Sequence, residues 1–230
     1  MFKKRSDRKE LLDAENIPVN DLYLNLSELN TINTLLGGHA VSLKAFQHFN
    51  IKPNEPITLI DIGCGGGDNL RMLAEYGRKK QLNLKLIGID LKEDCIRYAK
   101  EQCKSYPEIS FIQNDYRELI KNGFEFDIAF ACLFNHHLSN EENSLFFDWC
   151  YKNSKKGYFI NDLHRHPLAY YSIKFLTSIF SKSILVKNDA PLSVLRGFQK
   201  NELHRILEQT KIPAQIHWAW AFRYMVICKK

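Results

Sequence analysis

The sequence lacks the patterns that mark membrane, exported and disulfide-bonded proteins. No apolar run reaches about 18 residues without a charge, and no apolar core of a signal peptide follows the charged N-terminus. The six cysteines are scattered and include no Cys-x-x-Cys pair, which favours reduced thiols over disulfides or a zinc site. Repeats and low-complexity segments are absent as well. We therefore expect a cytoplasmic protein without stable membrane insertion.

The charge of the chain gives little support to nucleic-acid binding. The 230 residues include 32 basic and 26 acidic ones, a net charge of +6. Part of the excess lies at the termini, in "FKKRSDRK" and "CKK", and such ends are typical of solvated tails. No basic patch interleaved with aromatic residues accompanies them. We expect no nucleic-acid partner, and the composition leaves the oligomeric state open.

Strand-like and helix-like segments alternate from residue 57 onward, which predicts a mainly parallel sheet with helices on both faces. A helical N-terminal extension, residues 1–56, comes before them, and a helix near 199–210 with a final pair of strands follows. The strand-like runs are 57–62, 84–90, 109–115, 126–132 and 157–162, with helical patterns near 69–80, 92–104, 116–121 and 141–153.

An insertion, at about residues 163–198, interrupts the predicted domain 57–230. Residues 163–183 have a helical pattern rich in large apolar side chains, and a polar loop is expected at 186–197. The helix is interpreted as a cover of the sheet, as a lid or wall over a hydrophobic ligand, or as an interfacial membrane helix.

The stretch "LIDIGCGGGD", residues 59–68, places a glycine-rich turn between a buried strand and a helix. This arrangement opens nucleotide-binding α/β units. Asp68, however, occupies the place of the third glycine in the dinucleotide fingerprint, where an acid would repel a pyrophosphate. A Walker loop is excluded because no Gly-Lys-Ser/Thr follows. A ligand that carries adenosine but no phosphate suits the loop better.

The chain resembles the class I S-adenosylmethionine (SAM) methyltransferases in the order of its segments and in its strand-end acids. Their first motif, acid-x-Gly-x-Gly-x-Gly, is matched by Asp61, Gly63, Gly65 and Gly67. The resemblance implies a Rossmann-like, seven-stranded, mainly parallel sheet whose last strand is antiparallel. It also implies SAM as cofactor and S-adenosylhomocysteine (SAH) as product.

The resemblance assigns a role to each strand end. Asp90 is expected to accept both ribose hydroxyls, and Leu91 to lie beside the adenine. Asp115 is expected to accept from the adenine amino group, with Tyr116 beside the ring, although Asp115 also suits a helix N-cap. The implied cofactor-binding residues are Asp61, Gly63, Gly65, Gly67, Asp90, Leu91, Asp115, Tyr116, Ala131 and Cys132.

Histidines follow two neighbouring strands, in "FACLFNHHLSNEE" and "FINDLHRHPLAYY". Both segments resemble those of small-molecule methyltransferases of the quinone, polyketide and natural-product type. A histidine near the acceptor is a good base at pH 7, and an acceptor that is already nucleophilic needs none. The candidate catalytic residues are His136, His164, His137 and His166, in that order, and we expect no metal because no ligand cluster is left over.

These observations predict a SAM-dependent methyltransferase that acts on a small, aromatic or polyketide-like acceptor, most simply at oxygen. Carbon methylation of a quinone-like ring is one alternative, and a tRNA or protein methyltransferase is another. A SAM-binding protein without catalysis is the third. The Asn-Pro-Pro-Tyr segment of amino-group methyltransferases is absent, which argues against an sp² amine acceptor.

Overall fold

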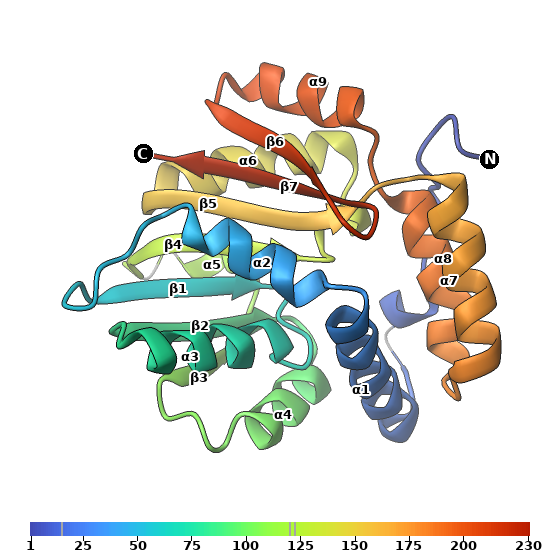
Figure 1. The fold of residues 1–230 in the computed structure, drawn as a ribbon, viewed down its shortest axis with the longest axis horizontal. Helices are drawn as coiled ribbons and strands as arrows, with labels where there is room; N and C mark the ends of the chain where they lie inside the picture. The colour runs from blue at the N-terminus through green and yellow to red at the C-terminus, as the bar shows by residue number, and fades with distance from the viewer. Residues whose placement is uncertain (15, 120, 122) are drawn as a thin grey trace.

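The computed structural model describes residues 1–14, 16–119, 121 and 123–230. Its centre is a seven-stranded sheet in the order β3-β2-β1-β4-β5-β7-β6 (Figure 1). Neighbouring strands are parallel except that β7 is antiparallel to both β5 and β6. The predicted Rossmann-like sheet and its antiparallel last strand are confirmed. The strands are β1 (Ile57–Ile62), β2 (Leu84–Asp90), β3 (Ile109–Gln113), β4 (Phe126–Cys132), β5 (Ser154–Leu163), β6 (Ala214–Ala219) and β7 (Arg223–Lys229).

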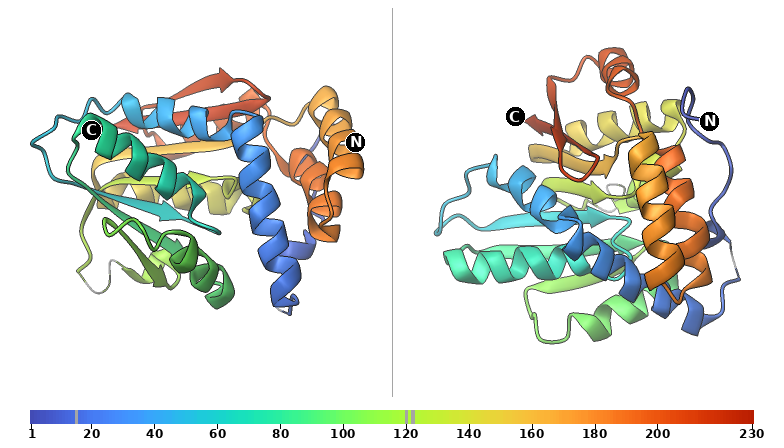
Figure 2. Two further views of the ribbon diagram at one scale, coloured as in Figure 1. Left: turned by 60° about the horizontal axis from the view of Figure 1, so that its bottom comes forward. Right: turned by 45° about the vertical axis from the view of Figure 1, so that its right-hand side comes forward.

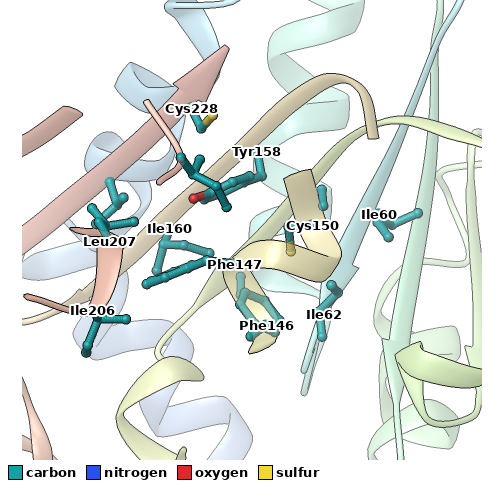
Figure 3. Packing of buried hydrophobic residues seen from close by; sticks show 14 of the residues in the cluster. Ile60, Ile62, Phe146, Phe147, Cys150, Tyr158, Ile160, Ile206, Leu207 and Cys228 are labelled. Atoms are coloured by element: carbon teal, nitrogen blue, oxygen red, sulfur yellow. The ribbon is translucent and has the colours of Figure 1, made fainter. Parts of the chain in front are cut away.

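Helices cover both faces of the sheet, as predicted (Figures 1 and 2). Alternate side chains of a strand point to opposite faces, so Leu59 packs with α2 and α3 while its neighbour Ile60 lies in the cluster with α6 and α9. Figure 3 shows that second cluster, in which each large buried side chain contributes about 1.5–3 kcal/mol. One face carries α2 (Gly38–Gln47), α3 (Asp68–Lys80) and α4 (Glu93–Gln102), and the other α5 (Tyr116–Leu119), α6 (Asn140–Asn153) and α9 (Lys200–Thr210). Residue 120, part of the predicted helix 116–121, lies outside the described residues.

Four further helical elements form a cap at the carboxyl ends of the parallel strands (Figures 1 and 2). In the cap, α8 contacts α7, α1 and η1. The predicted N-terminal extension contains both α2, which covers one face of the sheet, and α1, which belongs to the cap. Residues 1–56 therefore contribute to the sheet face and to the cap alike. The cap consists of η1 (Leu11–Asp13), α1 (Val19–Leu35), α7 (Pro167–Phe180) and α8 (Ile184–Arg196).

Helix α7 packs against α8 and does not cover the sheet, so that interpretation of residues 163–183 is wrong. Pro167 fits the first turn because its missing N–H would have no partner there, and the helix therefore starts after β5 has ended. Its inner residues Ala169 and Ile173 are buried against Val194. Its outer residues Leu168 and Phe175 are exposed. Within the described chain, no helix combines the length and apolar composition needed to cross a bilayer.

Residues 186–197 were expected to form a polar loop, but residues up to Arg196 belong to helix α8. Ser183 caps the helix by accepting a hydrogen bond from the Val186 amide at 3.2 Å. The buried carboxylate of Asp189 accepts from the amides of Leu11 and Leu12, both at 2.8 Å. Residues that favour turns in isolation are thus held in a helix by contacts with a distant segment, which overrides their local preference.

The N-terminal segment is not simply a solvated tail, contrary to expectation. Arg5 donates hydrogen bonds to the carbonyl oxygens of Arg196, His136 and Leu138 at 2.8–2.9 Å. Its guanidinium also lies over the ring of Phe198, 4.3 Å from the centroid. The segment therefore links helix α8 of the cap to the residues that follow β4.

Candidate active site

A cavity of about 410 Å³ lies where β1, β2 and β4 end beneath the cap. Parallel α/β sheets bind ligands at this edge. Of the predicted cofactor-binding residues, Gly67 and Ala131 do not line the cavity. The others do: Asp61, Gly63, Gly65, Asp90, Leu91, Asp115, Tyr116 and Cys132.

The glycines of the loop after β1 serve packing as well as ligand access. Gly63 has φ +73°, and a Cβ there would lie 2.4 Å from Cδ2 of Phe134. Gly67 has φ +70°, and its Cβ would come within 3.1 Å of the Cys103 sulfur. Both positions exclude side chains because of the protein's own neighbours. Gly65, in contrast, presents its bare backbone to the cavity.

Asp90 holds the glycine loop in place. One of its oxygens accepts from the Gly65 amide and the other from the Lys92 amide, each at 3.0 Å. Burial raises the pKa of this carboxyl, and the two amide hydrogen bonds oppose the rise. Each carboxylate oxygen retains acceptor capacity. The group thus fits the predicted contact with the two ribose hydroxyls, which stays a prediction.

Asp61 is a buried acid whose carboxyl group is incompletely hydrogen-bonded. The residue is 2% exposed, and its Oδ1 is buried without a hydrogen-bond partner in the described chain. Burial, with the charges of Asp68 and Asp90 nearby, raises its pKa well above the usual value. A buried carboxyl without a partner is costly, and the ammonium group of a methionine moiety would satisfy it. The residues present therefore fit SAM.

The far end of the first cavity suits an adenine ring. Leu91 is largely exposed, and Tyr116 packs edge-on against Trp149; burial raises the pKa of Tyr116 to about 12. Asp115 precedes α5 and accepts from the Arg117 amide at 2.9 Å. The Arg117 side chain also binds this carboxylate and, as the largest cause, lowers its pKa. The capping interpretation is borne out, and the adenine contact stays a prediction.

A second cavity, of about 320 Å³, adjoins the first under the cap. Leu133 lines both cavities at the exit of β4, with a left-handed backbone (φ +54°) that is rare for a leucine. Asn33 and His137 also line both. The apolar walls of the second cavity come from Ile32, Leu36, Leu163, Ala169, Ile173, Leu176, Val194 and Phe222.

The structure separates the four candidate histidines into two pairs. His136 and His137 lie in η3 (Asn135–His137) and line the second cavity. His164 and His166 do not line either cavity. His164 accepts from the Trp218 indole at 3.3 Å, and the His166 ring caps α7 by accepting from the Leu168 amide. Of the four candidate histidines, two therefore line a cavity and two do not.

His136 is deeply buried between two acids. Its Nδ1 lies 2.8 Å from an Asp162 oxygen, and its Nε2 lies 3.5 Å from Glu10. Burial lowers the pKa of the ring, but the carboxylates of Asp162 and Glu10 outweigh this effect and raise it to about 9. The ring therefore carries a proton at neutral pH when no other cation is bound there.

Several polar residues that line the second cavity or contact its histidines carry no local signal in the sequence. Glu10 and Asp13 lie in the N-terminal segment, yet both reach the histidines of η3. Arg223, at the start of β7, is 3% exposed and lines the cavity. Among the described residues, Glu10, His136 and His137 also form a group that could hold a metal ion, although no ligand cluster was expected.

The sheet, the glycine loop and the strand-end acids have the arrangement expected from the resemblance to class I SAM-dependent methyltransferases. Residues 59–157 match the family model of a methyltransferase domain. The ubiquinone biosynthesis O-methyltransferase of Saccharomyces cerevisiae mitochondria is 28% identical over 129 residues, which span 55% of this chain and 40% of the yeast protein. The matched region, residues 59–157, is a methyltransferase domain, as the resemblance predicted.

Solved structures agree on the fold. A SAM-dependent methyltransferase from Aquifex aeolicus superposes with a TM-score of 0.60 at 16% identity, covering 93% of this chain and 99% of that one. The plantazolicin methyltransferase BpumL, in complex with SAH, gives a TM-score of 0.65 at 16% identity, with 92% and 96% covered. At this identity the likeness concerns the fold alone.

Proposed function

We propose that the protein transfers the methyl group of SAM to an oxygen of a small aromatic or polyketide-like molecule bound in the second cavity. The observation that carries this proposal is the junction of the two cavities at Leu133, Asn33 and His137. A cofactor in the first cavity and an acceptor in the second would meet there, and no second protein domain is needed.

The size and walls of the second cavity favour a small acceptor over tRNA or protein. Its volume of about 320 Å³ lies in the range of small-molecule sites, and such sites are mostly apolar with a few polar groups. The cap, with α7 and α8 over the cavity, would also exclude water during transfer.

Arg223 supports an acceptor whose oxygen becomes anionic. Its guanidinium donates to the side-chain oxygens of Asn33 at 2.9 Å and Asn161 at 3.4 Å. In the described chain no carboxylate lies within 4.0 Å of it, although Asn33 itself donates to Asp68 at 3.2 Å. A buried positive charge without a direct counter-ion favours an anionic ligand. Phenols, enols and carboxylic acids provide one.

The bound cofactor supplies an electrophilic methyl group, and the chain's residues orient the acceptor. Holding acceptor and methyl in line can contribute about 7–11 kcal/mol. His136 was predicted to be the base, but a ring that already holds a proton stabilises an anionic oxygen better than it removes a proton. We assign that role to His136 together with Arg223. His164 and His166 would act only if the cap rearranged.

The cysteines are consistent with the expected cytoplasmic location, since all six are described and none forms a disulfide. We include this location in the proposal.

The test is a transfer assay with methyl-labelled SAM and a panel of alkyl- and aryl-substituted phenols, 1,3-diketones and carboxylic acids. We expect transfer to at least one class, with the label removed by methyl-ether or ester cleavage. Label that resists cleavage would indicate carbon methylation. The Arg223→Gln variant should transfer more slowly at unchanged SAH affinity. Labelling of tRNA or protein fractions alone would overturn the proposal.

A further inference from the structure

Three metal-ligating groups converge at the polar end of the second cavity. They come from the segment before η1 and from η3, and we call them the Glu10–His136–His137 cluster. The Glu10 carboxylate lies 3.5 Å from His136 Nε2 and 3.8 Å from His137 Nε2. One donor atom from each residue lies within 4.8 Å of the other two. All three residues line the second cavity.

The outer nitrogen of each ring is held by a carboxylate. His136 Nδ1 lies 2.8 Å from Asp162, which also accepts from the His136 amide at 3.0 Å. His137 Nδ1 lies 3.0 Å from Asp13. A ring that donates from Nδ1 to a carboxylate presents its Nε2 lone pair on the other side. Carboxylates oriented in this way are the usual supports of metal-binding histidines.

The inner nitrogen of His136 lacks a partner. Its Nε2 is fully buried and makes no hydrogen bond within the described chain. Glu10 is also positioned by others: one oxygen accepts from the Ser193 hydroxyl at 2.8 Å, and Arg196 lies 3.8 Å from the same oxygen. The second oxygen of Glu10 faces His137. One Glu10 oxygen thus lies near His136 Nε2 and the other near His137 Nε2, and the three residues offer donor atoms within 4.8 Å of one another.

The charges around the cluster leave room for a cation. Asp13 and Asp162 contact its two histidines; of the cations in the described chain, Arg196 contacts Glu10 and Asp13, and Arg5 lies near Asp162. With neutral rings the group is negative by one charge. Either a proton shared between His136 and Glu10 or a metal ion can balance it.

We propose that Glu10, His136 and His137 bind a divalent transition-metal ion of the zinc type, with its open coordination position facing the second cavity. Two histidines and one carboxylate are a common set for such ions, at about 2.0–2.2 Å from each ligand atom. Tetrahedral ligands at that distance are about 3.3 Å apart, and the two Glu10–histidine separations of 3.5 and 3.8 Å are close to that spacing. If the proposed methyl transfer is correct, the ion would replace the His136 proton and would itself bind the acceptor oxygen.

The test uses the full chain, freed of any affinity tag, treated with chelator and dialysed, then titrated with Zn²⁺. We expect one ion per chain by elemental analysis and a rise in melting temperature. Co²⁺ in place of Zn²⁺ should give the visible spectrum of a nitrogen- and oxygen-bound site. Glu10→Gln and His137→Ala should each weaken binding at least about tenfold.

His217→Ala serves as the matched control. It removes a histidine that packs near His48 (ring centroids 5.8 Å apart) and lines neither cavity, and it should leave binding unchanged. The proposal would be overturned if the wild-type protein took up no ion, or if the Co²⁺ spectrum were unchanged in both Glu10→Gln and His137→Ala. The proton shared between His136 and Glu10 would then be the balancing charge. SAH binding, measured in the same samples, keeps this outcome separate from the proposed function.

Discussion

Replacing Asp90 with alanine or asparagine separates cofactor binding from folding. The carboxylate has two tasks in the structure. It accepts from the Gly65 and Lys92 amides at 3.0 Å, and it faces the first cavity. Asparagine keeps the shape but turns an NH₂ group toward one of those amides. Alanine removes both acceptors.

The expected loss follows from these contacts. A hydrogen bond to a charged group contributes about 1.5–3 kcal/mol, and about 1.4 kcal/mol corresponds to tenfold in affinity. Loss of the ribose contact and of the loop's anchor should therefore weaken SAM binding at least about tenfold, and up to about 100-fold. Because Asp90 is only partly buried, we expect the fold to remain intact.

Isothermal titration calorimetry with SAM and SAH measures the change, and far-UV circular dichroism checks the fold. Asp94→Asn is the matched control, since it removes the same charge from the start of α4. Its carboxylate pairs with Arg97 at 3.0 Å and does not line the cavity. If Asp90→Ala were to bind SAM within about twofold of wild type, the ribose assignment would be refuted.

Three further predictions concern the cofactor loop and the cap. Because burial raises the pKa of Asp61, a cationic methionine moiety should displace up to about one proton from this carboxyl. The affinity for SAM should therefore rise with pH through that raised pKa. Calorimetry in buffers of different ionisation enthalpy should detect the proton release in wild type and no such release in Asp61→Asn. Gly63→Ala should lower the free energy of unfolding by about 1–3 kcal/mol, because its Cβ would lie 2.4 Å from Phe134; an unchanged urea midpoint would contradict this. Asp189→Ala leaves two amides of η1 without acceptors, which costs about 1–3 kcal/mol each. Trypsin should therefore cut near Arg8 faster than in wild type. Equal cutting rates would argue against the anchoring of η1 by Asp189.

The sheet and the cofactor loop could be read from local patterns. Apolar runs such as 57–62 predict buried strands, because both faces of a central strand in a parallel sheet are covered by helices. A strand-end acid such as Asp90 must lie at the ligand edge once the sheet is parallel. The predicted loop at 186–197 failed for the opposite reason. Its residues favour turns locally, and only contacts such as Asp189 with Leu11 and Leu12 hold them in a helix.

The amino-acid sequence by itself determined the α/β sheet, the SAM-type loop and three of the acids that line the first cavity, Asp61, Asp90 and Asp115, since each depends on spacing within about thirty residues, the length of one βαβ unit. Tertiary structure alone decided the second cavity. Asp13 and His137 are 124 residues apart in the chain, and Arg223 and Asn33 are 190 apart. These contacts form when the cap closes over the strand ends, and no local periodicity encodes which side chains meet there.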